Sequence, residues 1–456
     1  MESEGPKLQR KLTLLNATSI NMSNMVGIGP FITFPLIVGA MGGPQAMLGW
    51  VVGAVLAIMD GLVLSELGAA LPGSGGAYIF LREGYGPARW GRLMSFLFIW
   101  QFIWSGPLEI ASGNIGFVQY LSFLKKDLTP TEMKFMAAGV GVLAIILLYR
   151  KITDIAKLML ALWIGMLVTV GWVIVTGLVK FDATRAFSFP PGAFAADRNF
   201  FVGLGAASVY VMYCFLGYNQ ACSLGDEVLD PPRTIPRAVI LSVLGVFAID
   251  LLMNLVLLGV VPYGEVIRSP YPVSEMMARV YGPWAGVLLS LMVLWTAFAS
   301  IFALLLGYSR IPYAAALDGN FFRPFAKLHS HGFPHISLLV VGGMAVLASF
   351  FNLATVINAL MAARILIQFV GQIFAVALLR IYRPEVRRPF KMWLYPLPSL
   401  VAFAGWIYVF VSTGARYIFY GASVMVTGVI VYLVVAHRRK VWPFPAPAAR
   451  PGLAAE

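Results

Sequence analysis

Residues 14–40 read LLNATSINMSNMVGIGPFITFPLIVGA, an apolar stretch whose first half carries six small polar residues and whose middle is Gly-Ile-Gly-Pro. A helix surrounded by lipid cannot satisfy so many polar groups, so we expect this stretch to face protein or water. Pro30 disfavours helical backbone at Gly29 and suits the first turn of a new helix. The sequence therefore predicts a helix that breaks between Gly27 and Gly29.

A second apolar run is interrupted in the same way, at residues 213–220, which read YCFLGYNQ. One interrupted helix in each half of a chain is typical of transporters built from inverted repeats, which bind substrate at the breaks. An acid also recurs at matching places: Asp60 follows Ile28 by 32 positions, and Asp250 follows Gly217 by 33. The alternative is that these glycines only kink the helices, which membrane proteins tolerate.

The composition excludes a soluble protein. The chain has 456 residues, 59% hydrophobic and only 12% charged, with a mean hydropathy of +0.82. Soluble domains are about 25% charged. Stretches of about 20 apolar residues, the length that spans a bilayer, predict an all-α polytopic membrane protein with about twelve transmembrane helices. These segments are 14–40, 45–70, 90–119, 135–149, 155–178, 200–228, 236–261, 283–310, 336–352, 355–380, 393–414 and 416–436.

The basic residues predict the orientation. Of the 33 lysines and arginines, 23 fall in one set of alternate loops and termini, nine fall in the other set, and Arg364 falls inside a segment. Because cytoplasmic loops carry the basic excess, we expect both termini to be cytoplasmic in a multi-pass protein of the cell (inner) membrane. The net charge of +13 then needs no nucleic-acid partner. The N-terminus shows no signal-peptide pattern.

The predicted organisation has four parts. We expect a cytoplasmic tail at 1–13, a transporter core at 14–380, two further helices at 393–436 and a cytoplasmic tail at 437–456. The core would divide into five-helix repeats at 14–178 and 200–380.

The breaks supply backbone groups that suit a zwitterionic substrate. The second half of a broken helix exposes unpaired N–H groups at its positive dipole end, which favours a carboxylate. The end of the first half exposes carbonyl oxygens, which accept hydrogen bonds from an ammonium group. A zwitterion fits this pair of features.

Four motifs resemble one known family, the amino acid, polyamine and organocation (APC) superfamily of permeases, and within it relatives of the L-type amino acid transporters. They are Glu66-Leu67-Gly68 with Leu71-Pro72-Gly73-Ser74-Gly75-Gly76-Ala77-Tyr78, Asp226-Glu227 with Pro231 and Pro236-Arg237-Ala238, Ser309-Arg310-Ile311-Pro312-Tyr313-Ala314 with Asp318-Gly319, and Arg388-Pro389-Phe390-Lys391 with Tyr395-Pro396. The resemblance implies a LeuT-like fold of 5+5 inverted repeats and alternating-access transport of amino acids.

The resemblance also implies a set of site residues. The carboxylate would bind the amides of Ile28 and Gly29, with Gly27 allowing close approach. The amine would bind carbonyls of Met25, Tyr213 and Leu216, next to Gly217. Tyr213 matches an aromatic gate, and Lys157 resembles a lysine that occupies the place of a sodium ion. Relatives have Gly-Ser-Gly-Ile-Phe at the first break. Here Gly27-Ile28-Gly29-Pro30-Phe31 lacks one hydroxyl and one N–H, which makes a polyamine substrate more plausible.

Four ionisable residues fall inside predicted spans: Asp60, Glu109, Asp250 and Arg364. Charges there are costly and indicate function by default. Glu109 would bind a cationic substrate group or relay a proton, unless neighbouring Ser and Asn side chains simply hold it. Asp60 and Asp250 would be a symmetric structural pair, and Arg364 would pair with one of them.

We expect no cofactor, no metal site and no catalytic residue. Cys214 and Cys222 are predicted to pack in the interior, and His329, His331 and His335 to lie in a solvated loop. Coupling would be proton symport or exchange of one amino acid for another. The rivals are a polyamine carrier, a membrane-embedded enzyme, and a receptor or structural protein. No partner subunit is indicated.

Overall fold

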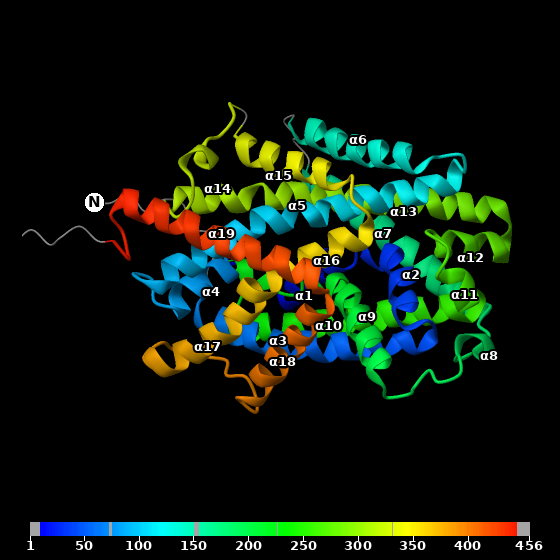
Figure 1. Cartoon of the computed structure of the whole chain (residues 1–456), viewed down its shortest axis with the longest axis horizontal. Coiled ribbons are helices and arrows are strands. Elements are labelled where there is room, and N and C mark those ends of the chain that lie inside the picture. Colours follow the sequence, from blue (N-terminus) through cyan, green and yellow to red (C-terminus); the bar gives the residue numbers. More distant parts are fainter. Residues whose placement is uncertain (1–9, 73–74, 150–154, 226, 331, 445–456) are drawn as a thin grey trace, which may run out of the picture.

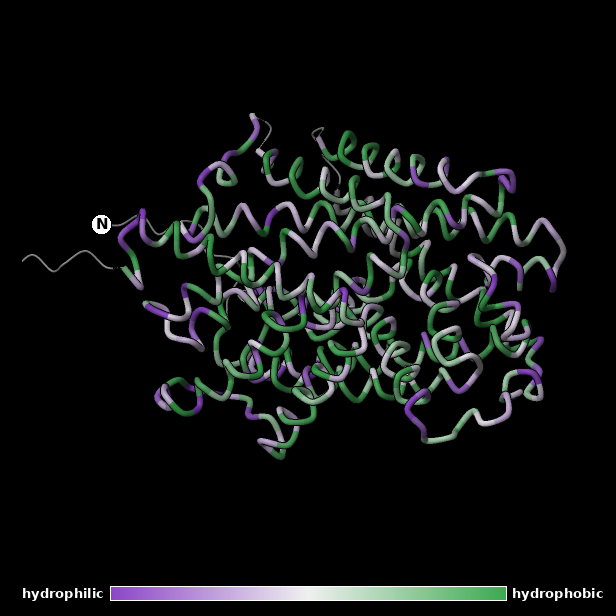
Figure 2. Tube along the Cα trace, in the orientation of Figure 1, coloured by the Kyte–Doolittle hydropathy of each residue, from purple (hydrophilic) through white to green (hydrophobic). Residues whose placement is uncertain are grey.

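The computed structural model describes residues 10–72, 75–149, 155–225, 227–330 and 332–444, without the side chains of 155–163. Its described residues form helices and one isolated β-bridge, between Leu12 and Val228. The long helices run side by side along the long axis of the molecule (Figure 1). Hydrophobic residues line these helices and hydrophilic residues gather toward their ends (Figure 2).

Each of the twelve predicted segments contains a helix. These helices are α1 (Leu14–Met25) with α2 (Gly29–Met41), α3 (Leu48–Ala70), α5 (Trp90–Leu124), α6 (Pro130–Leu148), α7 (Ile155–Val179), α9 (Arg198–Cys214), α10 (Pro231–Val260), α13 (Pro283–Tyr308), α15 (His335–Ala348), α16 (Leu353–Arg364) with α17 (Gly371–Tyr382), α18 (Leu397–Ser412) and α19 (Ala415–Arg439).

Short helices connect them. These are η1 (Pro44–Met47), α4 (Ala77–Gly84), α8 (Ala183–Ala186), η2 (Gln220–Ser223), α11 (Tyr263–Val266), α12 (Pro272–Tyr281), α14 (Arg310–Leu317) and η3 (Arg323–Ala326), and a π-helical stretch, η4 (Ile365–Val370), joins α16 to α17.

The described helices fit a bilayer. Seven of them are long and apolar enough to span a bilayer, and the number rises to eight if the bent pair α1–α2 is counted as one span. Three shorter apolar helices lie at Ile164–Val179, His335–Ala348 and Leu397–Ser412. Helix α6 exposes Leu143 and Ile146, and α19 exposes Val426 and Ile430. Contiguous exposed apolar surface of this kind suits contact with lipid. The prediction of an all-α polytopic membrane protein is confirmed.

The sixth segment differs from its prediction. We expected an interrupted helix over 200–228, but the α-helix ends at Cys214 and only the 3₁₀ turn η2 follows before α10. A side chain from the first segment replaces the missing helical bond, because Asn21 Oδ1 accepts a hydrogen bond from the Ala221 N–H at 2.7 Å. The second half of this segment is therefore a folded loop held by α1.

Candidate functional site

The first break has the predicted position. Helix α1 ends at Met25, α2 begins at Gly29, and the two are bent by 55°. The Val26 N–H still bonds back to Met22 O. The described backbone hydrogen bonds include none donated by Gly27 or Ile28. These amides are therefore free to bind an anionic group.

The second break touches the first. After α9 ends, the chain turns at Gly217, whose φ of +118° is a conformation that side-chain-bearing residues rarely adopt. A Cβ atom added at Gly217 would lie 2.7 Å from Asn24 Cβ. Glycine thus lets the backbone of the sixth segment approach α1 closely. The two breaks are far apart in sequence but adjacent in the structure.

A cavity lies where the breaks meet. Most of the predicted site residues line it, together with several that we did not predict. Its lining includes Met25, Gly27, Ile28, Gly29, Glu109, Tyr213 and Leu216 from the predicted set, and Ser23, Asn24, Gly113, Cys214, Ser300, Ala303 and Leu304 beyond it. Gly217 is not among the lining residues and acts instead through the close packing against Asn24.

Ser300 is the most informative of the missed residues. It lies on α13, and its Oγ would be 2.8 Å from a Cβ atom added at Gly27. Its hydroxyl donates to Thr296 O at 3.1 Å. A serine within an apolar helix gives no sign in sequence of which neighbour it meets. Only a face-by-face assignment of α13 could have found it.

Tyr213 is placed to close the cavity on one side. Its ring lies against the first break, with Cε1 3.3 Å from the position of a Cβ atom at Gly29. Its hydroxyl is 2.7 Å from Ser112 Oγ on α5. One hydrogen bond therefore holds the ring between the break and α5. Tyr213 O also accepts the Leu216 N–H at 3.2 Å, so one lone pair of that carbonyl is already used.

Glu109 faces the cavity but does not carry an unbalanced charge. Arg364 Nη1 lies 2.7 Å from Glu109 Oε2. The Tyr308 hydroxyl donates to the same oxygen at 2.6 Å. The prediction that Arg364 pairs with Asp60 or Asp250 is wrong, because tertiary packing brings α16 beside α5. The alternative that Ser and Asn side chains hold Glu109 is also wrong.

Asp60 and Asp250 are not equivalent. Asp60 is fully buried and accepts hydrogen bonds from the hydroxyl of Tyr218 and from Trp406 Nε1, the latter at 3.0 Å. Since Tyr218 follows Gly217, Asp60 anchors the second break. Asp250 is also buried, but its Oδ2 has no hydrogen-bond partner among the described residues. The predicted symmetry of the two acids is therefore wrong in its contacts.

The remaining predictions concern Lys157 and the histidines at 329, 331 and 335, which the structure describes only in part. Lys157 belongs to the backbone of α7, but its side chain lies outside the described residues, and so does all of His331. His329 and His335 lie near each other, with ring centroids 5.8 Å apart. Among the described residues no group of three or more His, Cys, Asp or Glu could hold a metal ion.

Comparison with known protein families identifies the family of this helical bundle. The family described as amino acid permease matches residues 12–436, nearly the whole described chain. The chain belongs to the amino acid permease family. Its family and the relatives below are transporters, not enzymes. The motifs predicted a member of the APC superfamily, and this prediction is confirmed.

Several relatives of this permease have described roles. It is 26% identical to the serine/threonine exchanger SteT of Bacillus subtilis over 91% of this chain and 93% of the exchanger. It is 25% identical to the human cystine/glutamate transporter over 88% of this chain and 79% of that protein. The cationic amino acid transporter 4 of mouse is 25% identical over 77% of this chain and 57% of its own length. These relatives differ in the charge of the amino acids they are named for.

Proposed function

We propose that this permease exchanges amino acids across the cell membrane by alternating access at the cavity between the two helix breaks. One observation carries the proposal: a cavity lined by Gly27, Ile28 and Gly29, with two of these amides donating none of the described backbone hydrogen bonds. Unpaired N–H groups at the start of a helix form a natural carboxylate site. The carbonyls of Met25, Tyr213 and Leu216 would bind the ammonium group.

The movement would be the rocking of one helix bundle around the central site. This bundle would belong to the core built from the repeats 14–178 and 200–380, with 393–436 outside them. Tyr213 would be the gate, because its ring already touches the first break. Lys157 would hold the place of a coupling ion. Both termini would be cytoplasmic, as the basic loops indicate.

Exchange is preferred to proton symport for two reasons. A relative that covers most of this chain is named as an exchanger. The acid on the cavity wall, Glu109, is held by Arg364 and Tyr308, which lessens its suitability as a proton carrier. The Glu109–Arg364 ion pair also argues against a polyamine substrate. The second ammonium group of a polyamine would need an acid that is not already paired with an arginine.

Uptake by reconstituted protein tests the proposal. Proteoliposomes would be loaded with or without unlabelled amino acid, with or without a proton gradient, and given labelled amino acids and diamines. We expect saturable amino-acid uptake that needs internal amino acid. Uptake driven by the proton gradient alone would replace exchange with symport, and no saturable uptake of any amino acid would refute the function.

Gly29→Val tests the location of the site. A Cβ atom at Gly29 would lie 3.3 Å from Tyr213 Cε1, so the larger side chain displaces the gate and covers the proposed carboxylate site. We expect uptake to fall at least a hundredfold with expression retained. The control is Gly39→Val on the same helix, where a Cβ atom meets only Ile267 at 3.6 Å. Equal uptake by both variants would exclude a site at this break.

A further inference from the structure

The ion pair between Glu109 and Arg364 lies at the edge of the cavity and is almost completely enclosed. The two side chains are 10% and 4% exposed, and the N–O distance is 2.7 Å. Of the two residues, only Glu109 lines the cavity. Arg364 therefore lies behind Glu109 as seen from the substrate.

Arg364 is fixed by further contacts. Its guanidinium carbon lies 5.8 Å from the ring centroid of Phe102 and 5.7 Å from that of Tyr308. Its Nε donates to Ser105 Oγ at 3.1 Å. The aromatic faces and the hydroxyl hold the cation in one position. The π-helical stretch η4 begins directly after it, and such irregular turns occur frequently at functional sites.

One nitrogen of Arg364 is left over. Nη2 is buried and has no hydrogen-bond partner among the described residues. A guanidinium can serve a carboxylate through two parallel N–H groups, but the contacts with Glu109 use only Nη1. Arg364 could therefore bind another anionic group if the Glu109 carboxylate were removed by substitution.

Charge balance at this wall has a direct consequence for the substrate. A buried charge without a partner is strongly unfavourable, whereas a compensated pair presents no net charge. A neutral side chain in the cavity leaves the pair undisturbed. A charged side chain must lose its water and finds no free opposite charge there.

We propose that the Glu109–Arg364 pair selects the charge class of the transported amino acid, admitting neutral side chains while it is intact. This inference rests on the proposed function. Removing one partner leaves the other as a receptor for the opposite charge: Glu109 for a cationic side chain and Arg364 for an anionic one. The effect of freeing Glu109 should be the larger, because Glu109 itself lines the cavity.

The experiment measures uptake of labelled serine, lysine and glutamate by proteoliposomes containing the full chain. For the unchanged protein we expect serine uptake to exceed both others at least tenfold. Arg364→Gln should raise the lysine-to-serine ratio at least tenfold, and Glu109→Ala, which also opens space, should raise the glutamate-to-serine ratio severalfold. The double variant Glu109→Gln with Arg364→Gln should return to a preference for serine.

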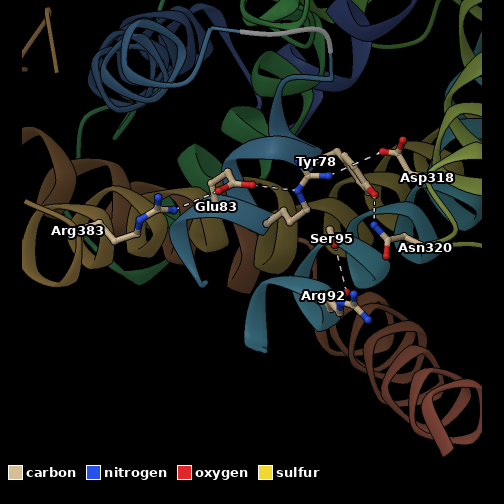
Figure 3. A network of polar contacts seen from close by, with 8 residues as sticks. Tyr78, Glu83, Arg92, Ser95, Asp318, Asn320 and Arg383 are labelled. Carbon is tan, nitrogen blue, oxygen red and sulfur yellow. Dashed lines mark hydrogen bonds and ion pairs between the residues drawn. The ribbon is translucent and has the colours of Figure 1, made fainter. Parts of the chain in front are cut away.

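Controls separate charge selection from loss of structure. Glu83→Gln removes another carboxylate that pairs with arginines, at 3.1 Å from Arg82 and 3.2 Å from Arg383 (Figure 3). Glu83 is not among the residues that line the cavity. It should leave all three uptake ratios unchanged. Arg364→Lys keeps the charge and should keep the preference for serine. Thermal stabilisation of the purified variants by each amino acid gives a second measurement that does not require transport.

The outcomes distinguish this inference from the proposed function. If the unchanged protein takes up serine but neither single variant shifts its ratio, or both shift toward the same charge, charge selection by this pair is refuted while amino-acid transport stands. A preference of the unchanged protein for lysine or glutamate also refutes it. If Arg364→Gln does not fold, Glu109→Ala decides: a gain of glutamate supports the pair and its absence overturns it. No uptake of any amino acid refutes the proposed function itself.

Discussion

At the scale of single residues, two acids in comparable positions of the two halves have different roles. Asp60 receives hydrogen bonds from Tyr218 and Trp406 and so connects the second break to α18. Trp406 in turn stacks on Phe369 of η4, with ring centroids 3.9 Å apart. Asp250 has a buried oxygen without a described partner. Both acids are buried, but only Asp60 stabilises its surroundings through hydrogen bonds to its carboxylate.

Asparagine at the two positions should therefore give opposite results. Asp60→Asn replaces an acceptor of two hydrogen bonds with a group that also presents donors, and should cost about 1–3 kcal/mol of stability. It should also reduce uptake, because Tyr218 adjoins the turn at Gly217. Asp250→Asn loses no described hydrogen bond through Oδ2 and replaces a buried carboxyl group with a neutral amide of similar size, so its stability should not fall. Thermal unfolding of both purified variants measures this difference, and an equal loss would contradict the assignment.

At the scale of elements, the breaks depend on glycine at one decisive position. Gly217 combines a φ of +118° with a Cβ position 2.7 Å from Asn24 Cβ. Both the backbone conformation and the space exclude a side chain. The two interrupted segments meet because this residue has none.

Gly217→Ala should separate the breaks. The strained backbone costs about 1–3 kcal/mol, and the added methyl group pushes α1 away, so we expect uptake to be lost and the unfolding temperature to fall. The matched control is Gly343→Ala in α15, where no atom lies within 4 Å of an added Cβ and alanine favours the helix. Uptake and unfolding temperature are compared for the two variants. Retained uptake in Gly217→Ala would show that close approach of the breaks is not required.

At the scale of the whole molecule, an ion pair between a buried acid and a partly exposed arginine joins segments that are far apart in sequence. Glu66 on α3 accepts from Arg380 Nε at 2.8 Å and from Arg380 Nη2 at 2.5 Å. It also accepts from the Met392 N–H at 2.9 Å, in the connection before α18. Glu66 is fully buried. This pair connects the end of the tenth segment to the second and eleventh.

Breaking this pair should destabilise the bundle far more than breaking one at the surface. Arg380→Gln leaves the buried Glu66 carboxylate without its cation, at a cost of about 3–5 kcal/mol. Glu83→Gln breaks a half-exposed pair with Arg383, worth about 1 kcal/mol or less. Thermal unfolding in detergent compares the two. Similar shifts would show that Glu66 has another source of compensation.

Most of the architecture could be predicted because it depends on local chemistry. Apolar length predicted all twelve segments, and glycine and proline at residues 27–30 predicted the first break at its observed place. Seven of the predicted site residues line one cavity. Gly217 does not, and the side chain of Lys157 lies outside the described residues. Segment six was the exception, since its second half is held by Asn21 of α1 and not by its own helical bonds.

Two features could be derived from local sequence alone. The chain crosses the membrane many times, because its long apolar segments match the thickness of a bilayer. Its first segment breaks near Gly29, because Pro30 disfavours helical backbone at the residue before it. The pairing of the acids depends on tertiary packing. Glu109 pairs with Arg364 and Glu66 with Arg380, whereas Asp250 Oδ2 has no hydrogen-bond partner among the described residues. The physical reason is that a charge finds its partner through the packing of helices distant in sequence, and hydropathy and spacing contain no measure of that proximity.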